Sequence, residues 1–219
     1  MWRAFFAIVR KEFLAAFRSR HNIAAELYFV VGSVLILVLG FPQVRLDAGQ
    51  QSGVVWVVVY FVAMMTVARS YVIEQERSTL LYVMHVAPAD AVYWGKLVAS
   101  VLWLIVVGGI QMLLMGAFSL VPVRFESAAV VMIGCAAIGA ATSLLAAIVA
   151  AARLRNWVFA AIAFPIVMPI FFLGVDSLAT VLAGGEIVSA VTELTVMLLY
   201  VIVVAIVAWW LFPFIWSEA

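Results

Sequence analysis

Charged residues are scarce in this sequence. Only 11% of its 219 residues are Asp, Glu, Lys or Arg, whereas 68% are hydrophobic, and the mean hydropathy is +1.26. Soluble domains carry about 25% charged residues, and a water-soluble fold with so little charge would expose large apolar patches and aggregate. The composition therefore predicts an integral membrane protein.

Cysteine and catalytic motifs are also scarce. The single cysteine, Cys135, excludes an intramolecular disulfide and a thiolate metal cluster, and its small, apolar neighbours predict an inert buried thiol. The motifs HExxH, GxSxG and CxxCH are absent, and Gly95-Lys96 lacks the upstream glycine of a phosphate-binding loop. His21 and His85 are expected to be solvated or packing residues rather than haem or metal ligands. We therefore expect no enzymatic activity, no ATP site and no metal or cofactor in this chain.

Long apolar runs are abundant. A helix needs about 20 mostly apolar residues to cross the hydrocarbon core, and five runs readily qualify. A sixth is interrupted by Pro165 and Pro169, which are tolerated where neighbours or water satisfy the freed carbonyls. The predicted spans are about 24–41, 54–73, 93–120, 128–152, 157–175 and 191–212. Residues 177–190 are too short to cross and are expected to be re-entrant or interfacial. The predicted fold class is all-α, with residues 1–219 forming a single transmembrane domain.

The positive charges are distributed unevenly between the two ends of these spans. Ten of the 12 Lys and Arg residues fall at one face, and only Arg45 and Arg124 fall in the opposite loops. Cytoplasmic loops carry an excess of Lys and Arg, so both termini are predicted to be cytoplasmic. Glu26 begins the first span and Glu193 the last, but no charge sits at mid-span, so ion-coupled transport is not supported. The energy for any transport should come from elsewhere.

Residues 1–20 have the pattern of an amphipathic helix. Their aromatic and apolar residues recur at spacings of three and four, which predicts a stripe along one side of a helix. The basic residues fall mainly off that stripe, as in helices that lie in the headgroup plane. The stripe consists of Trp2, Phe5, Phe6, Val9, Phe13, Ala16 and Phe17. We expect an interfacial helix here; the alternative is the basic flank of a signal-anchor span.

Residues 74–91 form a loop between spans two and three that mixes charged and apolar residues. Ser78 or Thr79 can cap a short helix, which Pro88 ends, and Asp90 can cap the helix that follows. One use for such an element is to dock a soluble partner and transmit its motion to the spans; the alternative is a solvated loop resting on the headgroups. The residues predicted to form this coupling interface are Glu74, Glu76, Arg77, Ser78, Leu80, Leu81, Met84, His85, Pro88 and Lys96.

Three segments resemble ABC-2-type permeases, and among them the CcmB family, described as haem exporter protein B of cytochrome c maturation. The resemblance is carried by EQERSTLLYVMHVAPADAVYWGKLVASVLW (74–103), FRSRHNIAAELYF (17–29) and FPIVMPIFFLGV (164–175). The chain departs from the family pattern at Arg77-Ser78, where an acidic-Gly pair is usual, and at Arg155-Asn156, where Gly-Gly is common.

The resemblance implies a permease subunit of the bacterial inner membrane that contributes half of a transporter. Two copies, or one copy with a partner permease, would sit on two CcmA-like ATPase subunits that bind the ATP and move residues 78–87. A CcmC-like haem-handling protein is the further implied partner, and its tryptophan-rich motif is absent here, so no haem contact is expected of this chain. Other substrates (a thiol reductant, a lipid, a polysaccharide or a drug) and a non-transporting assembly scaffold are the alternatives. No nucleic-acid partner is expected.

Overall fold

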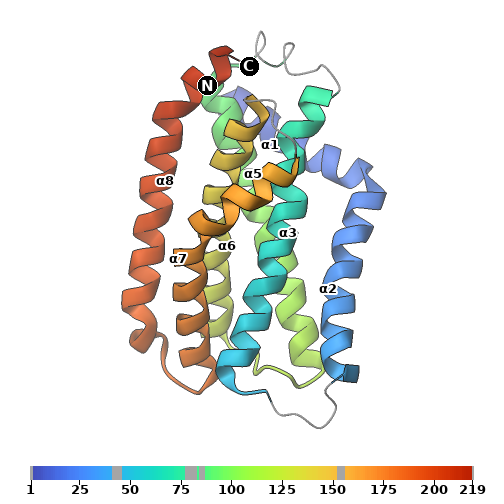
Figure 1. Ribbon diagram of the computed structural model, residues 1–219, viewed down its shortest axis with the longest axis vertical. Coiled ribbons are helices and arrows are strands. Elements are labelled where there is room, and N and C mark those ends of the chain that lie inside the picture. Colours follow the sequence, from blue (N-terminus) through green and yellow to red (C-terminus); the bar gives the residue numbers. More distant parts are fainter. Residues whose placement is uncertain (1, 41–45, 77–82, 84–86, 152–155, 219) are drawn as a thin grey trace.

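The computed structural model describes residues 2–40, 46–76, 83, 87–151 and 156–218. These residues form a bundle of long helices with one shorter helix across an end (Figure 1). Its elements are α1 (Trp2–Arg18), α2 (Arg20–Gly40), α3 (Ala48–Glu76), α5 (Ala89–Ala117), α6 (Phe125–Ala151), α7 (Asn156–Leu182), the 3-10 turn η1 (Ile187–Ala190) and α8 (Val191–Glu218).

Six of these helices, α2, α3, α5, α6, α7 and α8, are long and apolar enough to cross a membrane. Both chain ends lie at the same end of the bundle, which we call the termini end (Figure 1). Helix α1 also lies there, and the described loops at the other end are short. The prediction of an all-α protein with six spans is confirmed.

Two helix starts are set by local chemistry at the termini end. Helix α5 begins after Pro88, which is its N-cap residue and has an extended backbone (φ −65°, ψ 143°). Proline disfavours the helical conformation in the residue before it, so α5 does not extend back through Ala87. Asp90 is thus inside the first turn, and our expectation that it caps this helix is wrong. Helices α1 and α2 are separated by Ser19 alone, whose N–H donates to Ala16 O at 3.0 Å.

Helix α6 lies at the centre of the bundle and contacts α3, α5, α7 and α8. About 72% of its spanning window is buried, the highest share among the six spans. Its small residues explain this position, because helices approach closely where side chains are small. A Cβ on Gly139 would lie 2.8 Å from Cγ2 of Val101 on α5, so α5 and α6 are in near-backbone contact there.

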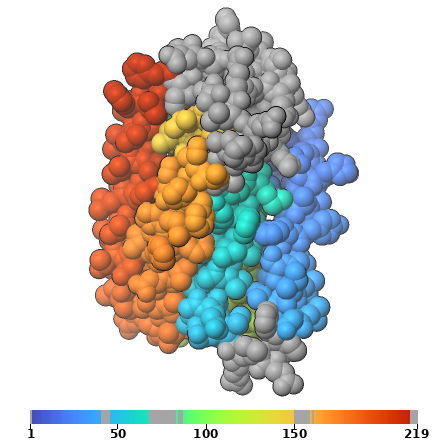
Figure 2. All heavy atoms as spheres, viewed as in Figure 1, coloured from blue at the N-terminus to red at the C-terminus, as the bar shows by residue number. Residues whose placement is uncertain are grey.

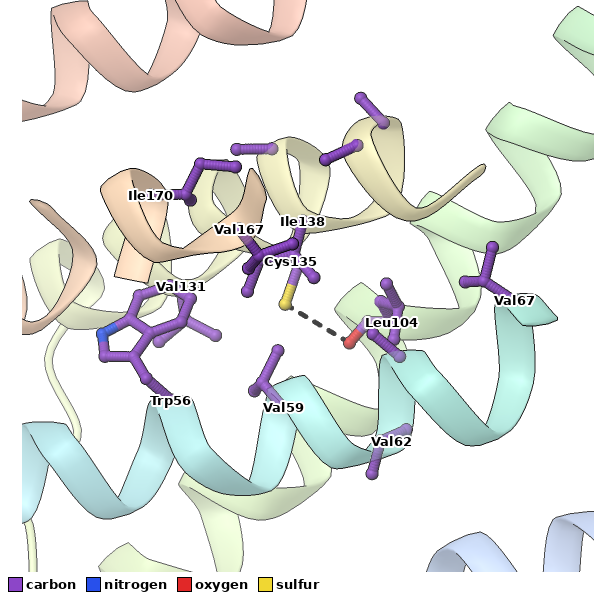
Figure 3. Packing of buried hydrophobic residues seen from close by; sticks show 14 of the residues in the cluster. Trp56, Val59, Val62, Val67, Leu104, Val131, Cys135, Ile138, Val167 and Ile170 are labelled. Atoms are coloured by element: carbon purple, nitrogen blue, oxygen red, sulfur yellow. Dashed lines mark hydrogen bonds between the residues drawn. The ribbon is translucent and has the colours of Figure 1, made fainter. Parts of the chain in front are cut away.

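Trp56 of α3 fills the junction between α3, α6 and α7 (Figure 3). Its indole is fully buried and lies against Gly134 of α6 and Gly174 of α7. A Cβ on Gly174 would lie 2.8 Å from Cε2 of the ring, and a Cβ on Gly134 would overlap Cη2. Two glycines therefore form the slot that receives the largest side chain of the core.

Buried polar side chains add hydrogen bonds between the helices near this junction. Ser52 Oγ donates to Val175 O at 2.8 Å and joins α3 to α7, while Gln111 Nε2 of α5 donates to Val55 O at 3.3 Å. Cys135 of α6 is buried, and its thiol donates to Leu104 O at 3.5 Å (Figure 3). Such bonds satisfy polar groups that have no water in the hydrocarbon core.

Helix α7 continues through both of its prolines. Tyr200 of α8 donates its hydroxyl hydrogen to Ile166 O at 3.2 Å, in the segment of α7 between Pro165 and Pro169. The helix extends to Leu182, and Gly185 N–H donates to Thr180 O at 3.0 Å. Residues 177–190 are therefore the last turns of α7, a turn at Gly184 (φ +95°) and η1, rather than a re-entrant segment.

Candidate functional site

The predicted coupling interface is described only at its edges. Glu74 and Glu76 lie in the last turn of α3, and Pro88 and Lys96 lie at the start of α5, so both edges are at the termini end. The backbones of these residues are described, but the side chains of Glu74 and Glu76 are not. The remaining predicted residues, Arg77, Ser78, Leu80, Leu81, Met84 and His85, lie outside the described residues.

Lys96 is buried at the contact between α5 and α1. Only 1% of the residue is exposed, although a lysine is rarely buried without a partner. Its Nζ donates to Glu12 Oε1 of α1 at 3.0 Å, and the Glu12 side chain is 14% exposed. An ion pair of this kind holds two helices relative to each other, because separating its two charges is costly where burial limits access of water.

The Glu12 carboxyl titrates under opposing influences. Burial raises its pKa, but the ammonium groups of Lys96 and Lys11 attract the charged form and hydrogen-bond to it. Their combined effect is larger, so the pKa of Glu12 lies below its usual value of 4.5. Lys11 Nζ is 3.3 Å from the same Oε1 atom. The carboxylate is therefore charged at neutral pH, as an ion pair with Lys96 requires.

Close backbone packing accompanies the ion pair. Gly95 lies next to Lys96 and faces Ile8, the one buried residue of α1. A Cβ at position 95 would lie 2.6 Å from Cγ2 and 2.8 Å from Cβ of Ile8, so any larger residue would push α1 away. Because glycine has no side chain, α1 can pack closely on α5 at position 95, next to the residue that carries the buried ammonium.

A second carboxylate reaches the same helix from α2. Trp103 Nε1 donates to Glu26 Oε2 at 2.6 Å, and Glu26 is 6% exposed. Phe17 of α1 stacks edge-on against the Trp103 ring with centroids 6.0 Å apart. Lys96, Ser100 and Trp103 are spaced four and three residues apart on one face of α5. We call this face the polar seam; α1 meets it through Glu12, and α2 through Glu26.

The start of α5 is also joined to the end of α8. Trp209 Nε1 donates to Asp90 Oδ1 at 3.0 Å, and the buried Tyr93 ring packs on Phe212 with centroids 5.3 Å apart. The indole N–H of Trp209, near the end of the last span, thus has a specific partner on α5. The first turns of α5 are therefore held by α1 on one side and by α8 on another.

Helix α1 presents three different sides. Ile8 and Glu12 face the bundle, while Trp2, Phe6 and Phe17 are between 61% and 76% exposed. Arg3, Arg10 and Arg18 are exposed as well. The exposed fractions differ along the predicted stripe, since Phe5 is half-buried while Trp2 and Phe6 are exposed. A helix with exposed aromatics beside exposed cations suits the boundary between headgroups and hydrocarbon.

An open apolar groove of about 460 Å³ lies between α3 and α7. Figure 2 shows these two helices side by side on one face of the molecule. The groove is lined by Val57, Tyr60, Phe61, Met64, Ala161, Phe164 and Phe171. Among the described residues, no three His, Cys, Asp or Glu side chains are grouped so that they could hold a metal ion.

The described part of the chain thus defines a class: a multi-pass α-helical membrane protein whose charged side chains join helices at one end of the bundle. A family model described as CcmB protein matches residues 3–218, nearly the whole chain, so the chain belongs to the CcmB family. No curated protein matches it significantly. Family membership makes the chain a haem-exporter permease component in cytochrome c maturation, part of a Ccm ABC transporter complex and not an enzyme.

Sequence reasoning missed Glu12, the role of Glu26 and the role of Trp103. Glu12 is the only acidic residue in a basic, aromatic segment of 20 residues, and Glu26 and Lys96 are charges at the starts of apolar spans. Such isolated charges signal that a partner exists, because an unpaired charge is costly near the hydrocarbon core. They do not reveal which residue is the partner.

Proposed function

We propose that this chain is the membrane subunit of an ABC transporter and is driven by a separate ATPase subunit that docks at the termini end. Family membership carries the proposal. The architecture supports it, because the predicted coupling loop, residues 74–91, starts in the last turn of α3 and ends in the first turn of α5, both at the termini end. ATP binding on the partner would move residues 78–87, and that motion would enter the spans through α3 and α5.

The connections of α5 suit it to receive such a motion. Its first turns contact α1 through the Lys96–Glu12 ion pair and α8 through Asp90–Trp209. Further along, Trp103 bonds to Glu26 of α2. A displacement of Pro88 would therefore act on three other helices at once. In the assembled transporter we propose two copies of this chain, or one copy with a partner permease, and a CcmC-like haem-handling protein.

The termini end is proposed to be cytoplasmic, in the inner membrane of a bacterium. Exposed Arg3, Arg10, Arg18 and Arg20 lie at or near α1, as the excess of positive charge in cytoplasmic loops requires. Fusing a reporter that is active only in the cytoplasm to either terminus tests this orientation. Activity at both termini is the expected result, and activity at neither would reverse the proposed orientation.

The ATPase partner is tested by co-expressing the tagged chain with the Walker-motif ATPase of its transporter and purifying the complex. Leu81→Asp should reduce the recovered ATPase strongly, because it places a charge on the predicted docking helix. Val188→Asp is the matched control, since Val188 is 70% exposed at the opposite end. Full ATPase recovery after deletion of residues 78–87 would contradict the coupling role.

The same preparation separates a transporter from a scaffold and tests the cargo. We expect ATP hydrolysis by the complex to change when this subunit is omitted or carries Leu81→Asp. Hydrolysis that is indifferent to this subunit would favour an assembly scaffold. Export of haem by reconstituted vesicles, compared with a lipid, a thiol reductant and a polysaccharide precursor, would establish the substrate.

A further inference from the structure

The contact between α1 and α5 joins two parts of the molecule with different surroundings. Helix α1 exposes Trp2, Phe6 and Phe17 together with neighbouring arginines, as expected for a helix at a membrane surface. Helix α5 is a span that begins at the end of the predicted coupling loop. If α1 and α5 move together, the force between them passes through the contact between these two helices.

That contact is unusually specific for a surface helix. Its centre is the ion pair between Glu12 and the fully buried ammonium of Lys96, at 3.0 Å. Ile8 packs against Gly95 so closely that no side chain fits between them. A helix that merely rested on headgroups would need neither a buried counter-ion nor a glycine at this position.

The ion pair favours one position of α1 along α5 and disfavours sliding of the two helices past each other. An ion pair in a medium of low dielectric constant weakens steeply as its atoms separate, because water does not screen it. The next polar residue of the seam toward the bundle centre, Ser100, is one helical turn further and carries no charge. Glu12 therefore has one favourable register on α5, and α1 is held there.

We propose that Glu12 is a positioning residue for energy coupling, and that its ion pair with Lys96 makes α1 and the first turns of α5 move as one rigid unit. This inference rests on the proposed function, because the motion originates at the ATPase. On this view α1 is a moving part of the transporter, displaced along the membrane surface whenever Pro88 is displaced.

The test begins with the isolated chain in lipid nanodiscs. Spin labels at positions 10 and 106, which are exposed on α1 and α5, report the distance between the helices by pulsed electron resonance after Cys135→Ala. The wild-type side chains should give a narrow distribution, and Glu12→Gln a broader or shifted one. Glu186→Gln is the matched control, because Glu186 is an exposed carboxylate at the opposite end.

The second arm uses the complete complex with its ATPase. We expect Glu12→Gln to lower haem export from reconstituted vesicles, per ATP hydrolysed, by between roughly twofold and thirtyfold, the range found for residues that carry coupling between sites. The exchange Glu12→Lys with Lys96→Glu, and the conservative Glu12→Asp, should restore much of it. In the wild type, trapping ATP should leave the 10–106 distance unchanged.

The outcomes separate the two proposals. A Glu12→Gln chain with the wild-type distance distribution and wild-type transport per ATP would overturn the positioning role. Failure of the wild-type chain to bind any ATPase would overturn the proposed function, while the nanodisc measurement would still test whether Glu12 holds α1 on α5. Glu12→Gln is nearly isosteric and leaves Lys96 in place, so we expect the variant to fold. The yield of monodisperse protein, compared with that of the wild type, checks this.

Discussion

The indole ring of Trp56 lies against the backbone of Gly134, so that α3 and α6 meet where a large ring faces a residue without a side chain. The same ring lies against Gly174 of α7. Close packing dominates this junction, with hydrogen bonds from Ser52 to Val175 O and from Gln111 to Val55 O beside it. The polar seam at the termini end joins helices mainly through charged side chains.

We expect Gly134→Ala to destabilise the protein by about 1–3 kcal/mol, because the new methyl group overlaps the Trp56 ring and overpacking has that cost. Thermal unfolding in detergent, followed by tryptophan fluorescence, measures the change. Gly109→Ala is the control, since no atom lies within 4 Å of a Cβ there, and alanine is favoured over glycine in a helix by up to about 1 kcal/mol. Equal melting temperatures for the two variants would refute the tight junction.

We expect Trp103→Phe to destabilise the protein by about 1 kcal/mol, because it removes the N–H that bonds to Glu26 while keeping a ring against Phe17. Trp210→Phe, at a tryptophan that is 69% exposed, should have little effect. The same melting assay compares them. If the Trp210 variant proved the less stable of the two, the Glu26–Trp103 bond would have no stabilising role.

The Glu12 ion pair gives a pH dependence of defined sign. The pKa of Glu12 is lowered in the folded protein, so its stabilisation is present above the usual value of 4.5 and is lost as the pH falls through the lowered pKa. The melting temperature of the wild type should therefore exceed that of Glu12→Gln by a constant amount from neutral pH down to pH 4.5. Below that value the difference should shrink. A difference that vanished already near pH 6 would contradict this prediction.

Cys135 should not react with a maleimide in the native protein, because its thiol is fully buried and donates to Leu104 O. Denaturation should make it react fully. A cysteine introduced at exposed position 188 is the positive control. Rapid labelling of native Cys135 would show that the contact of α5 with α6 opens. Slow labelling would also make the natural chain suitable for single-cysteine mapping of the membrane topology.

The sequence predicts the number of spans well because each apolar run is long enough to require the hydrocarbon core. It predicts helix ends less well. Residues 177–182 continue α7 beyond the predicted end near 175, where Ser52 of α3 donates to Val175 O. Neighbours supplied by other helices decide such cases, and they are not visible in the local pattern.

The site shows the same limit. Lys96 was predicted as part of the coupling interface, and it lies within α5, buried against α1. Its partner Glu12 lies 84 positions earlier, and the pairing depends on how α1 is rotated about its own axis. The aromatic stripe suggested one rotation, whereas Ile8 and Glu12 face the bundle. Close packing at Gly95 decides the rotation, and periodicity alone does not reveal it.

Glu12 precedes Lys96 by 84 positions, so the two partners of the ion pair are synthesised one well before the other. A chain leaves the ribosome with its N-terminal end first, so Glu12 reaches the membrane surface well before Lys96 is made. When α5 enters the bilayer, the counter-ion for its buried cation is already present. A chain that was synthesised without its first helix would have to insert α5 without that counter-ion, and α1 would in this sense assist the biogenesis of the span that it later moves with.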